Sequence, residues 1–134
     1  MEECIFCQII QGVQPAFVIA DDGATLSFVS LENHPLVVPR RHVEALYDLD
    51  DATGAALMRA TVRVARALKR GLACDGVYLT QANGSAAGQD VFHLHVHLYP
   101  RWVSPAPAGG WVPTAADEER RRTAAQVRAA LDDA

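Results

Sequence analysis

The sequence lacks the features that would tie the protein to a membrane or to a nucleic acid polymer. No apolar run comes near the ~20 residues that a membrane-spanning helix requires. The N-terminal stretch, MEECIFCQII, is acidic and lacks the basic segment that begins a secretory signal. Twelve Lys and Arg face 16 Asp and Glu, so the net charge of −4 provides no basic footprint for duplex nucleic acid, although a small nucleotide needs only a local cradle. We therefore expect a cytoplasmic protein with no membrane partner and no polymeric nucleic acid partner.

Cysteine is also scarce, with three residues in the chain. Thiols stay reduced in the cytoplasm, where structural disulfides are rare. Cys4 and Cys7 form a C-x-x-C pair, which in a reducing compartment is more often a metal or redox motif than a disulfide. Cys74 stands alone, and we interpret it as a small buried residue.

The rest of the composition is that of one ordinary globular domain. The 134 residues are half hydrophobic and 21% charged, and neither a repeat nor a low-complexity linker interrupts them. A chain of this length can bury a single core. We therefore treat residues 1–134 as one domain.

Two helices are predicted. The first runs from Asp50 or Asp51, as its N-cap, to Gly71, which suits the C′ position after a basic last turn. Its core-facing stripe, spaced at i, i+4, i+8 and i+11, consists of Leu57, Thr61, Ala65 and Leu68. The second is a C-terminal helix over 114–133, begun by a capping box of Thr114 and Asp117, with EERRR as its solvated face.

The intervening segments predict an antiparallel sheet. Short strands are expected at Phe17–Ala20, Thr25–Val29, 35–39, 76–81 and 91–100, the last stopped by a proline. The loop ANGSAAGQD is too short for a helical crossover, so the strands on either side of it are expected to pair antiparallel. The fold class is therefore α+β, with a sheet of about five strands, one long helix and a C-terminal helix.

The most unusual stretch is VFHLHVHLYPRW, which holds three of the five histidines. On a strand, His93, His95 and His97 would share one face while Leu94 and its apolar neighbours pack on the core. A merely polar strand face is one interpretation. The histidines could instead chelate zinc with an open position, as in a metal-assisted hydrolase. Alternatively, one histidine could be a nucleophile presented to a phosphate or acyl group.

The loop before this strand favours an anionic ligand. Gly84 and Gly88 permit backbone angles that other residues resist, and clustered N–H groups in such a turn form an anion-binding nest. Asn83 and Gln89 add side-chain amides that could hold a phosphate or sugar. A bound phosphate would then lie beside the histidines.

These segments together resemble the histidine triad (HIT) superfamily. HLHVHLY is similar to its triad motif and ANGSAAGQD to its signature loop, while CIFCQIIQG and LVVPRRH resemble stretches of its zinc-containing bacterial branch. The resemblance covers Cys4 to about Trp102. It implies a HIT-like fold paired into a homodimer, and a hydrolase or transferase acting at the α-phosphate of a nucleotide, often adenosine, through a nucleotidyl-histidine intermediate.

Carried over by position, the resemblance implies a role for each residue. His95 would be the nucleophile, and His97 would contact the phosphate and help to protonate the leaving group. Backbone amides around Gly88–Asp90, with Asn83 and Gln89, would hold phosphate and ribose. The residues matching the base pocket are Phe6, Ile9, Phe28 and Leu31. The proposed structural zinc ligands are Cys4, Cys7, His42 and His93, and His34 is interpreted as structural.

Two positions depart from the family pattern. Ser30 stands where relatives carry an acidic residue that grips the ribose, and the following turn is about four residues shorter, so sugar recognition could be weaker or the substrate different. Asp90 stands where some relatives have a hydroxyl residue that helps the leaving group; a carboxylate could act as an acid only with a raised pKa. Two other functions therefore stay open: a non-catalytic nucleotide-binding module of the same fold, and a zinc-dependent hydrolase.

Overall fold

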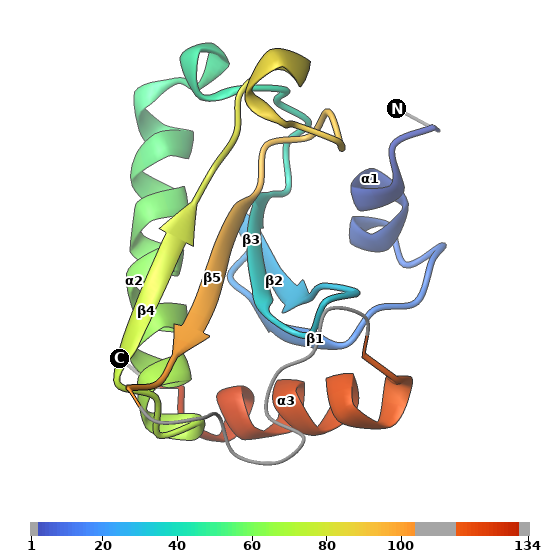
Figure 1. The fold of residues 1–134 in the computed structure, drawn as a ribbon. Coiled ribbons are helices and arrows are strands. Elements are labelled where there is room, and N and C mark those ends of the chain that lie inside the picture. The colour runs from blue at the N-terminus through green and yellow to red at the C-terminus, as the bar shows by residue number, and fades with distance from the viewer. Residues whose placement is uncertain (1–2, 104–114, 132–134) are drawn as a thin grey trace.

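The computed structural model describes residues 3–103 and 115–131. Five strands form one antiparallel sheet in the order β1-β2-β3-β5-β4 (Figure 1). The strands are β1 (Val18–Asp21), β2 (Thr25–Val29), β3 (Pro35–Pro39), β4 (Gly76–Thr80) and β5 (Val96–Arg101). The predicted α+β class and the antiparallel pairing of β4 with β5 are both confirmed.

In the described ranges, three α-helices pack around the sheet: α1 (Ile5–Ile10), α2 (Asp51–Gly71) and α3 (Asp117–Ala129). Two short 3₁₀ turns, Leu46–Asp48 and Ser85–Ala87, lie in the loops. In Figure 1, α2 runs along one face of the sheet, α3 crosses below it and α1 stands apart on the other side. Among the described residues, none of the helices has the length and apolarity to cross a bilayer.

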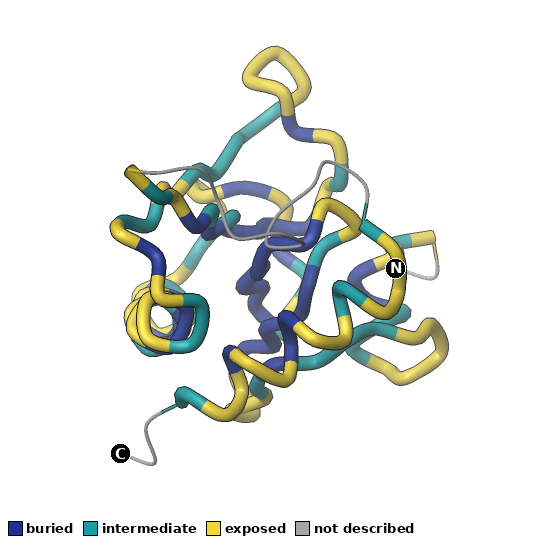
Figure 2. Tube along the Cα trace, turned by 60° about the horizontal axis from the view of Figure 1, so that its bottom comes forward, coloured by how far each residue is buried: buried dark blue, intermediate teal, exposed yellow. Residues whose placement is uncertain are grey.

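Both faces of the central strands are covered, which explains why every residue of β2 and β3 is buried. On the α2 and α3 face, the core includes Val29, Val37, Leu57, Val64, Leu68, Leu98 and Val127. On the α1 face, a smaller cluster contains Phe6, Leu26, Phe28, Leu36 and Val38. The alternation of Leu36, Val37 and Val38 between the two clusters follows the period of two that a strand imposes. Figure 2 shows the buried trace at the centre and the exposed loops and helix faces around it.

Helix α2 begins as predicted and ends differently. Asp50 is the N-cap, and its carboxylate accepts a hydrogen bond from Thr53 N at 2.8 Å. Gly71 was expected at C′ but is the last helical residue, and the left-handed conformation falls instead on Ala73, at φ +50°. A Cβ on Gly71 would lie 2.7 Å from the backbone oxygen of Gln126 in α3. The glycine is therefore required by close helix packing rather than by a turn.

The histidine stretch is only partly a strand, and this corrects the prediction of a strand over 91–100. β5 begins at Val96, so His93 and His95 precede it and only His97 lies on it. Leu94 N donates to Val43 O, a loop carbonyl, at 2.7 Å, which keeps this segment out of the sheet ladder. Pro100 does not stop the strand because β3 pairs only as far as His97, and a proline is tolerated where a strand has one neighbour.

The structure also bears on several smaller predictions from the sequence. Leu57, Thr61 and Leu68 of the predicted stripe are buried, and Ala65 is half-buried. Cys74 is buried, as predicted. Helix α3 begins at Asp117 with no side-chain cap, while Thr114 of the predicted capping box lies outside the described residues.

Candidate functional site

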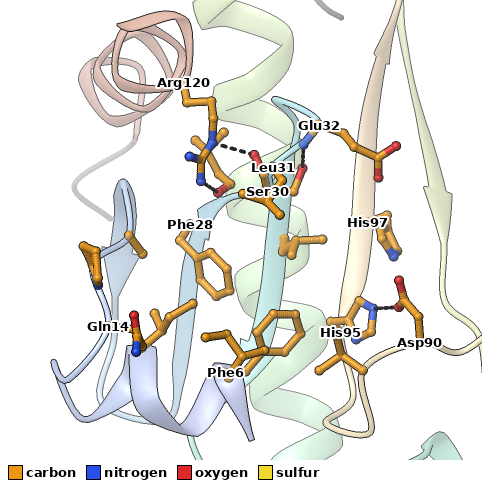
Figure 3. Close-up of a pocket in the computed structure, with 17 residues that line it drawn as sticks. Phe6, Gln14, Phe28, Ser30, Leu31, Glu32, Asp90, His95, His97 and Arg120 are labelled. Carbon is orange, nitrogen blue, oxygen red and sulfur yellow. Dashed lines mark hydrogen bonds and ion pairs between the residues drawn. The ribbon is translucent and has the colours of Figure 1, made fainter. Parts of the chain in front are cut away.

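A pocket of about 460 Å³ opens between α1, the end of β2 and the start of β5 (Figure 3). Its floor is apolar, and its polar groups gather at the ends of β2 and β5. The residues predicted for it that line it are Phe6, Ile9, Phe28, Ser30, Leu31, Asp90, His95 and His97. The predicted base-pocket residues and the two catalytic candidates therefore share one cavity.

The apolar part is built by α1 against β2. Phe6 and Phe28 meet edge to face, with ring centroids 5.5 Å apart, and Phe6 also lies edge-on to His95 at 5.1 Å. Leu31 is 71% exposed at the rim. An apolar slot with polar groups at one end suits a flat ring joined to a charged group.

His95 has a defined tautomer. Its Nδ1 lies 2.8 Å from the backbone oxygen of His93, and a carbonyl can only accept, so Nδ1 carries the proton. Neutral His95 therefore keeps its lone pair on Nε2. That nitrogen lies 3.8 Å from Asp90 Oδ1, whose side chain is largely exposed at the mouth of the pocket (Figure 3). The geometry makes His95 Nε2 a candidate nucleophile or base.

His97 belongs to a buried line of polar contacts. Its Nδ1 is 2.9 Å from Nε2 of His34, and Nδ1 of His34 is 3.1 Å from Ser30 Oγ. Burial, with His97 nearby, lowers the pKa of His34 to about 3, and burial, with His95 nearby, lowers the pKa of His97 to about 4. Both rings are therefore neutral at pH 7. His34 is fully buried, in keeping with its structural interpretation.

The hydroxyl of Ser30 is directed at His34, which bears on the expectation that it could hold a sugar hydroxyl. Besides the contact with His34, Ser30 Oγ accepts the backbone N–H groups of Glu32 and His34. Its hydrogen-bonding capacity is thus used inside the protein.

The side-chain amides of the loop ANGSAAGQD form hydrogen bonds with the backbone of the loop and its neighbours and do not line the pocket. Gly84 and Gly88 have φ of +87° and +95°, as the sequence requires. Gln89 is buried, its oxygen accepting from Gly84 N at 2.7 Å and its nitrogen donating to Glu44 O at 2.7 Å. Asn83 Oδ1 accepts from Leu46 N at 2.7 Å.

Three of the residues expected to hold phosphate and ribose, Asn83, Gly88 and Gln89, do not line the pocket. The N–H groups of Gly88 and Gln89 donate within the loop, to Ser85 O and Gly84 O. The amides of Asn83 and Gln89 hold the loop, and neither residue lines the cavity. Of the stretch Gly88–Asp90, only Asp90 lines it.

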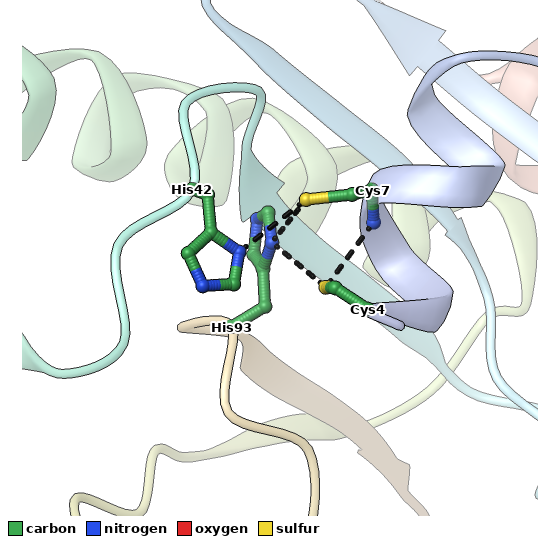
Figure 4. Close-up of side chains that lie close together, drawn as sticks. All are labelled: Cys4, Cys7, His42 and His93. Carbon is green, nitrogen blue, oxygen red and sulfur yellow. Dashed lines mark hydrogen bonds between the residues drawn. The ribbon is translucent and has the colours of Figure 1, made fainter. Parts of the chain in front are cut away.

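A second constellation lies beside the pocket (Figure 4). The ligand atoms of Cys4, Cys7, His42 and His93 all lie within 4.8 Å of one another. Cys4 is the N-cap of α1 and Cys7 lies within it, the segment after β3 supplies His42, and His93 precedes β5. Cys7 Sγ is 3.3 Å from His42 Nδ1 and 3.6 Å from His93 Nδ1, and Cys4 Sγ is 3.4 Å from His93 Nδ1.

These residues fit a tetrahedral metal. Zinc–sulfur bonds of ~2.3 Å and zinc–nitrogen bonds of ~2.0–2.1 Å separate sulfur from nitrogen by about 3.6 Å in a tetrahedron. His93 Nε2 is 2.7 Å from Pro39 O and must donate, which leaves the lone pair of Nδ1 facing the sulfurs. Burial and the neighbouring Cys4 raise the pKa of the Cys7 thiol to about 11, so metal binding must displace its proton.

Arg120 at the pocket wall was missed from the sequence, which assigned EERRR to a solvated face. Its side chain is only 13% exposed, and Nε donates to Ser30 O at 3.0 Å (Figure 3). The guanidinium also lies over the ring of Phe17, 4.9 Å from its centroid. The signal was available, because Arg120 shares a helix face with Ala124 and Val127, which are buried at i+4 and i+7.

Comparison with known proteins agrees with this geometry. The family model described as the HIT domain matches residues 11–102. Protein hit of Bacillus subtilis strain 168 is 34% identical over 121 residues, 87% of this chain and 83% of that protein. The adenosine 5′-monophosphoramidase HNT1 of Saccharomyces cerevisiae is 33% identical over 102 residues, 73% of this chain and 62% of that protein.

Solved structures give the same result. A zinc-bound histidine triad family protein from Mycobacterium smegmatis has a TM-score of 0.84 at 32% identity, over 97% of this chain and 94% of that one. The family model covers more than half of the sequence, and the structural likeness extends over almost all of it. The chain therefore belongs to the histidine triad, or HIT-domain, family and resembles its zinc-containing branch.

Proposed function

We propose that the protein is a nucleotide hydrolase or nucleotidyl transferase that acts at the α-phosphate of a nucleotide through His95. The observation that carries the proposal is the state of His95, whose Nδ1–H is held by the His93 carbonyl at 2.8 Å. Nε2 is thereby left with a free lone pair at the polar end of a pocket with an apolar slot. An imidazole nucleophile needs this tautomer.

The reaction has two displacements. In the first, the lone pair of His95 Nε2 forms a bond to the α-phosphorus, and the leaving group departs with the electron pair of its bond and takes up a proton. In the second, water or another acceptor attacks phosphorus, the P–N bond breaks, and its electrons return to Nε2 as the attacking oxygen loses its proton. Splitting the reaction in this way replaces one difficult step with two easier ones.

The nucleotide would lie with its base in the slot of Phe6, Ile9, Phe28 and Leu31 and with its phosphate beside His95 and His97. An adenosine nucleotide is supported by the name of the yeast relative, an adenosine 5′-monophosphoramidase. Phosphoramidates and dinucleoside polyphosphates are therefore the first substrates to test.

We propose zinc as the ion held by Cys4, Cys7, His42 and His93, with a structural role. A bound ion would tie α1, which carries Phe6 and Ile9, to the segment that carries His95. The donor set and its spacing support zinc, and so does the zinc-bound relative. No step of the proposed reaction passes through the metal.

We also propose a homodimer in the cytoplasm, formed along β4. β4 is an edge of the sheet, and a shallow apolar groove of about 340 Å³ beside it includes Leu46, Met58 and Leu79, all exposed. A second copy could continue the sheet and cover the same groove on both chains. Sedimentation of the wild type and of Leu79→Lys tests this, because only the wild type should form a dimer.

The central experiment compares the wild type with His95→Ala. Turnover of adenosine 5′-phosphoramidate should fall by more than about 10⁴-fold, while nucleotide binding and metal content persist. Intact-protein mass spectrometry of the wild type during turnover should find a nucleotidyl adduct that His95→Ala lacks. Arg122→Gln, an exposed position on α3, is the control. Unchanged turnover in His95→Ala would rule the proposal out.

A second candidate is a nucleotide-binding module without catalysis, because Ser30 stands where the resemblance expects an acidic sugar contact and its hydroxyl is engaged by His34 and two backbone N–H groups. In that case the wild type binds nucleotides but hydrolyses neither phosphoramidates nor dinucleoside polyphosphates. The zinc hydrolase makes a different prediction: chelation would stop turnover in protein that remains folded, whereas activity that survives chelation excludes it.

A further inference from the structure

Behind the pocket, two side chains of the turn between β2 and β3 and one side chain of β5 form a continuous hydrogen-bonded line. Ser30 Oγ contacts His34 Nδ1 at 3.1 Å, and His34 Nε2 contacts His97 Nδ1 at 2.9 Å. Ser30 and His97 both line the pocket, and His34 is fully buried between them. The direction of each hydrogen bond follows from counting donors and acceptors.

Both lone pairs and the proton of the Ser30 hydroxyl have partners. A hydroxyl oxygen has two lone pairs and one proton. The backbone N–H groups of Glu32 and His34 both donate to Ser30 Oγ, each at 3.2 Å, and fill the two lone pairs. Only the hydroxyl proton is left for the side chain of His34, so Ser30 donates and His34 Nδ1 accepts.

His34 is in turn the hydrogen-bond donor to His97. A neutral imidazole carries one proton, so His34, which accepts at Nδ1, is protonated at Nε2 and donates to His97 Nδ1. The hydroxyl of Tyr99 lies 3.3 Å from the same nitrogen of His97, a position from which it can donate as well. Burial lowers the pKa values of His34 and His97, which keeps both rings neutral. The proton of His97 is therefore on Nε2.

We propose that Ser30, acting through His34, is a positioning residue that holds His97 as a neutral Nε2–H donor toward the phosphate. The inference rests on the proposed function. It assigns to Ser30 a role in place of sugar binding, because its hydroxyl sets the tautomer of a ring two contacts away.

The pocket then presents two neighbouring imidazoles that are in opposite tautomers. The ring centroids of His95 and His97 are 4.9 Å apart. His95 carries its proton on Nδ1 and offers a lone pair at Nε2, whereas His97 offers an N–H at Nε2. A nucleophile and a hydrogen-bond donor can thus face one phosphoryl group. With the opposite tautomer, His97 would turn a lone pair toward the phosphate oxygens and repel them.

The test substitutes Ser30, which is less buried than His34 and so less liable to unfold the protein. In Ser30→Ala the two N–H groups lose their acceptor and His34 Nδ1 loses its donor, so the line can reverse. We expect kcat to fall by about 10–100-fold, the usual cost of losing an orienting partner, with KM changed by less than about threefold because the base slot is intact. Ser30→Thr retains a hydroxyl and should recover most of the lost kcat.

A second readout does not depend on turnover. Long-range ¹H–¹⁵N correlation of histidine-labelled, metal-loaded protein distinguishes the Nδ1–H and Nε2–H tautomers, and comparison with His97→Gln assigns the signals of His97. The wild type and Ser30→Thr should have His97 protonated at Nε2, and Ser30→Ala should have a mixture. A wild-type His97 protonated at Nδ1, or a Ser30→Ala variant with unchanged kcat, overturns the proposal. A wild type that turns nothing over but has the expected tautomer refutes the proposed function and supports the hydrogen-bond direction.

Discussion

The contact between α2 and α3 predicts that a substitution which usually stabilises a helix will destabilise this protein. Gly71 ends α2, and a Cβ built on it would lie 2.7 Å from Gln126 O and 3.1 Å from Gln126 C. Real Cβ atoms do not approach backbone atoms so closely, and a backbone cannot swing away as a side chain can. Gly71→Ala must therefore push the two helices apart.

Two opposing terms set the size of the effect. Alanine is favoured over glycine within a helix by ~1 kcal/mol, and less at a terminal residue. Forcing one extra carbon into a packed contact costs about 1–3 kcal/mol. The repulsion prevails, so the free energy of unfolding should fall by about 1–2 kcal/mol. For a chain of this size that lowers Tm by about 3–8 °C.

Gly54 in the same helix provides the matched control. A Cβ there would meet only Leu49 Cδ1, at 4.0 Å, which is ordinary van der Waals contact. Gly54→Ala should therefore stabilise the protein by about 0.5–1 kcal/mol. Urea unfolding followed by circular dichroism at 222 nm measures both variants against the wild type.

The two glycine substitutions should thus differ in sign. If Gly71→Ala stabilises the protein as Gly54→Ala does, α3 does not lie against α2 at the described distance. The outcome also matters for the site, because α3 carries Arg120 to the pocket wall. A shift of α3 in Gly71→Ala would weaken the hydrogen bond from Arg120 to Ser30 O.

Three further predictions concern the metal, the pocket wall and pH. Elemental analysis of the wild type should find one zinc per chain. Cys7→Ser should lose the metal and, with it, about 4 kcal/mol of the free energy of unfolding, the value for zinc present at about 1,000 times its Kd. Cys74→Ala, which lies outside the cluster, should keep the metal. Arg120→Gln should lower the free energy of unfolding by about 1–2 kcal/mol through its lost hydrogen bond and ring contact, and Arg122→Gln by less than about 0.5 kcal/mol; equal urea midpoints would refute the packed role of Arg120. Burial lowers the pKa of His34 from 6.5 to about 3, so the unfolded chain binds more protons between these values and stability should fall as pH drops from about 6.5 toward 3. His34→Gln should flatten that fall in urea titrations, and an unchanged slope would contradict it.

The sequence predicted the elements whose pattern is local. β2 and β3 have the predicted bounds, and Asp50 caps α2 as predicted because an N-cap is decided by the residues of one turn. The start of β5 could not be read in this way. His93 and His95 alternate with apolar residues as a strand does, but Leu94 N–H is taken by Val43, far away in the sequence. Tertiary hydrogen bonds overrode the period of two.

The candidate site was also predicted only in part. The slot of Phe6 and Phe28 and the four-residue cluster follow from a resemblance that aligns whole segments. Asn83 and Gln89 do not line the pocket, because a short loop with two left-handed glycines uses those amides for its own backbone and its neighbours. Arg120 was missed because an arginine on an acidic, arginine-rich turn is usually solvated, although Arg120 lies on the helix face of the buried Ala124 and Val127.

His93 links the two constellations. Its side chain contributes Nδ1 to the metal cluster, with Nε2 held by the Pro39 carbonyl at 2.7 Å. Its own backbone carbonyl accepts Nδ1–H of His95 at 2.8 Å. A bound metal ion that shifted the ring of His93 would therefore also shift the backbone carbonyl that fixes the His95 tautomer. Removing the metal would then lower activity by displacing this carbonyl, and would not remove a group that takes part in the reaction. A chelated protein that stays folded should therefore retain a reduced kcat rather than lose it altogether.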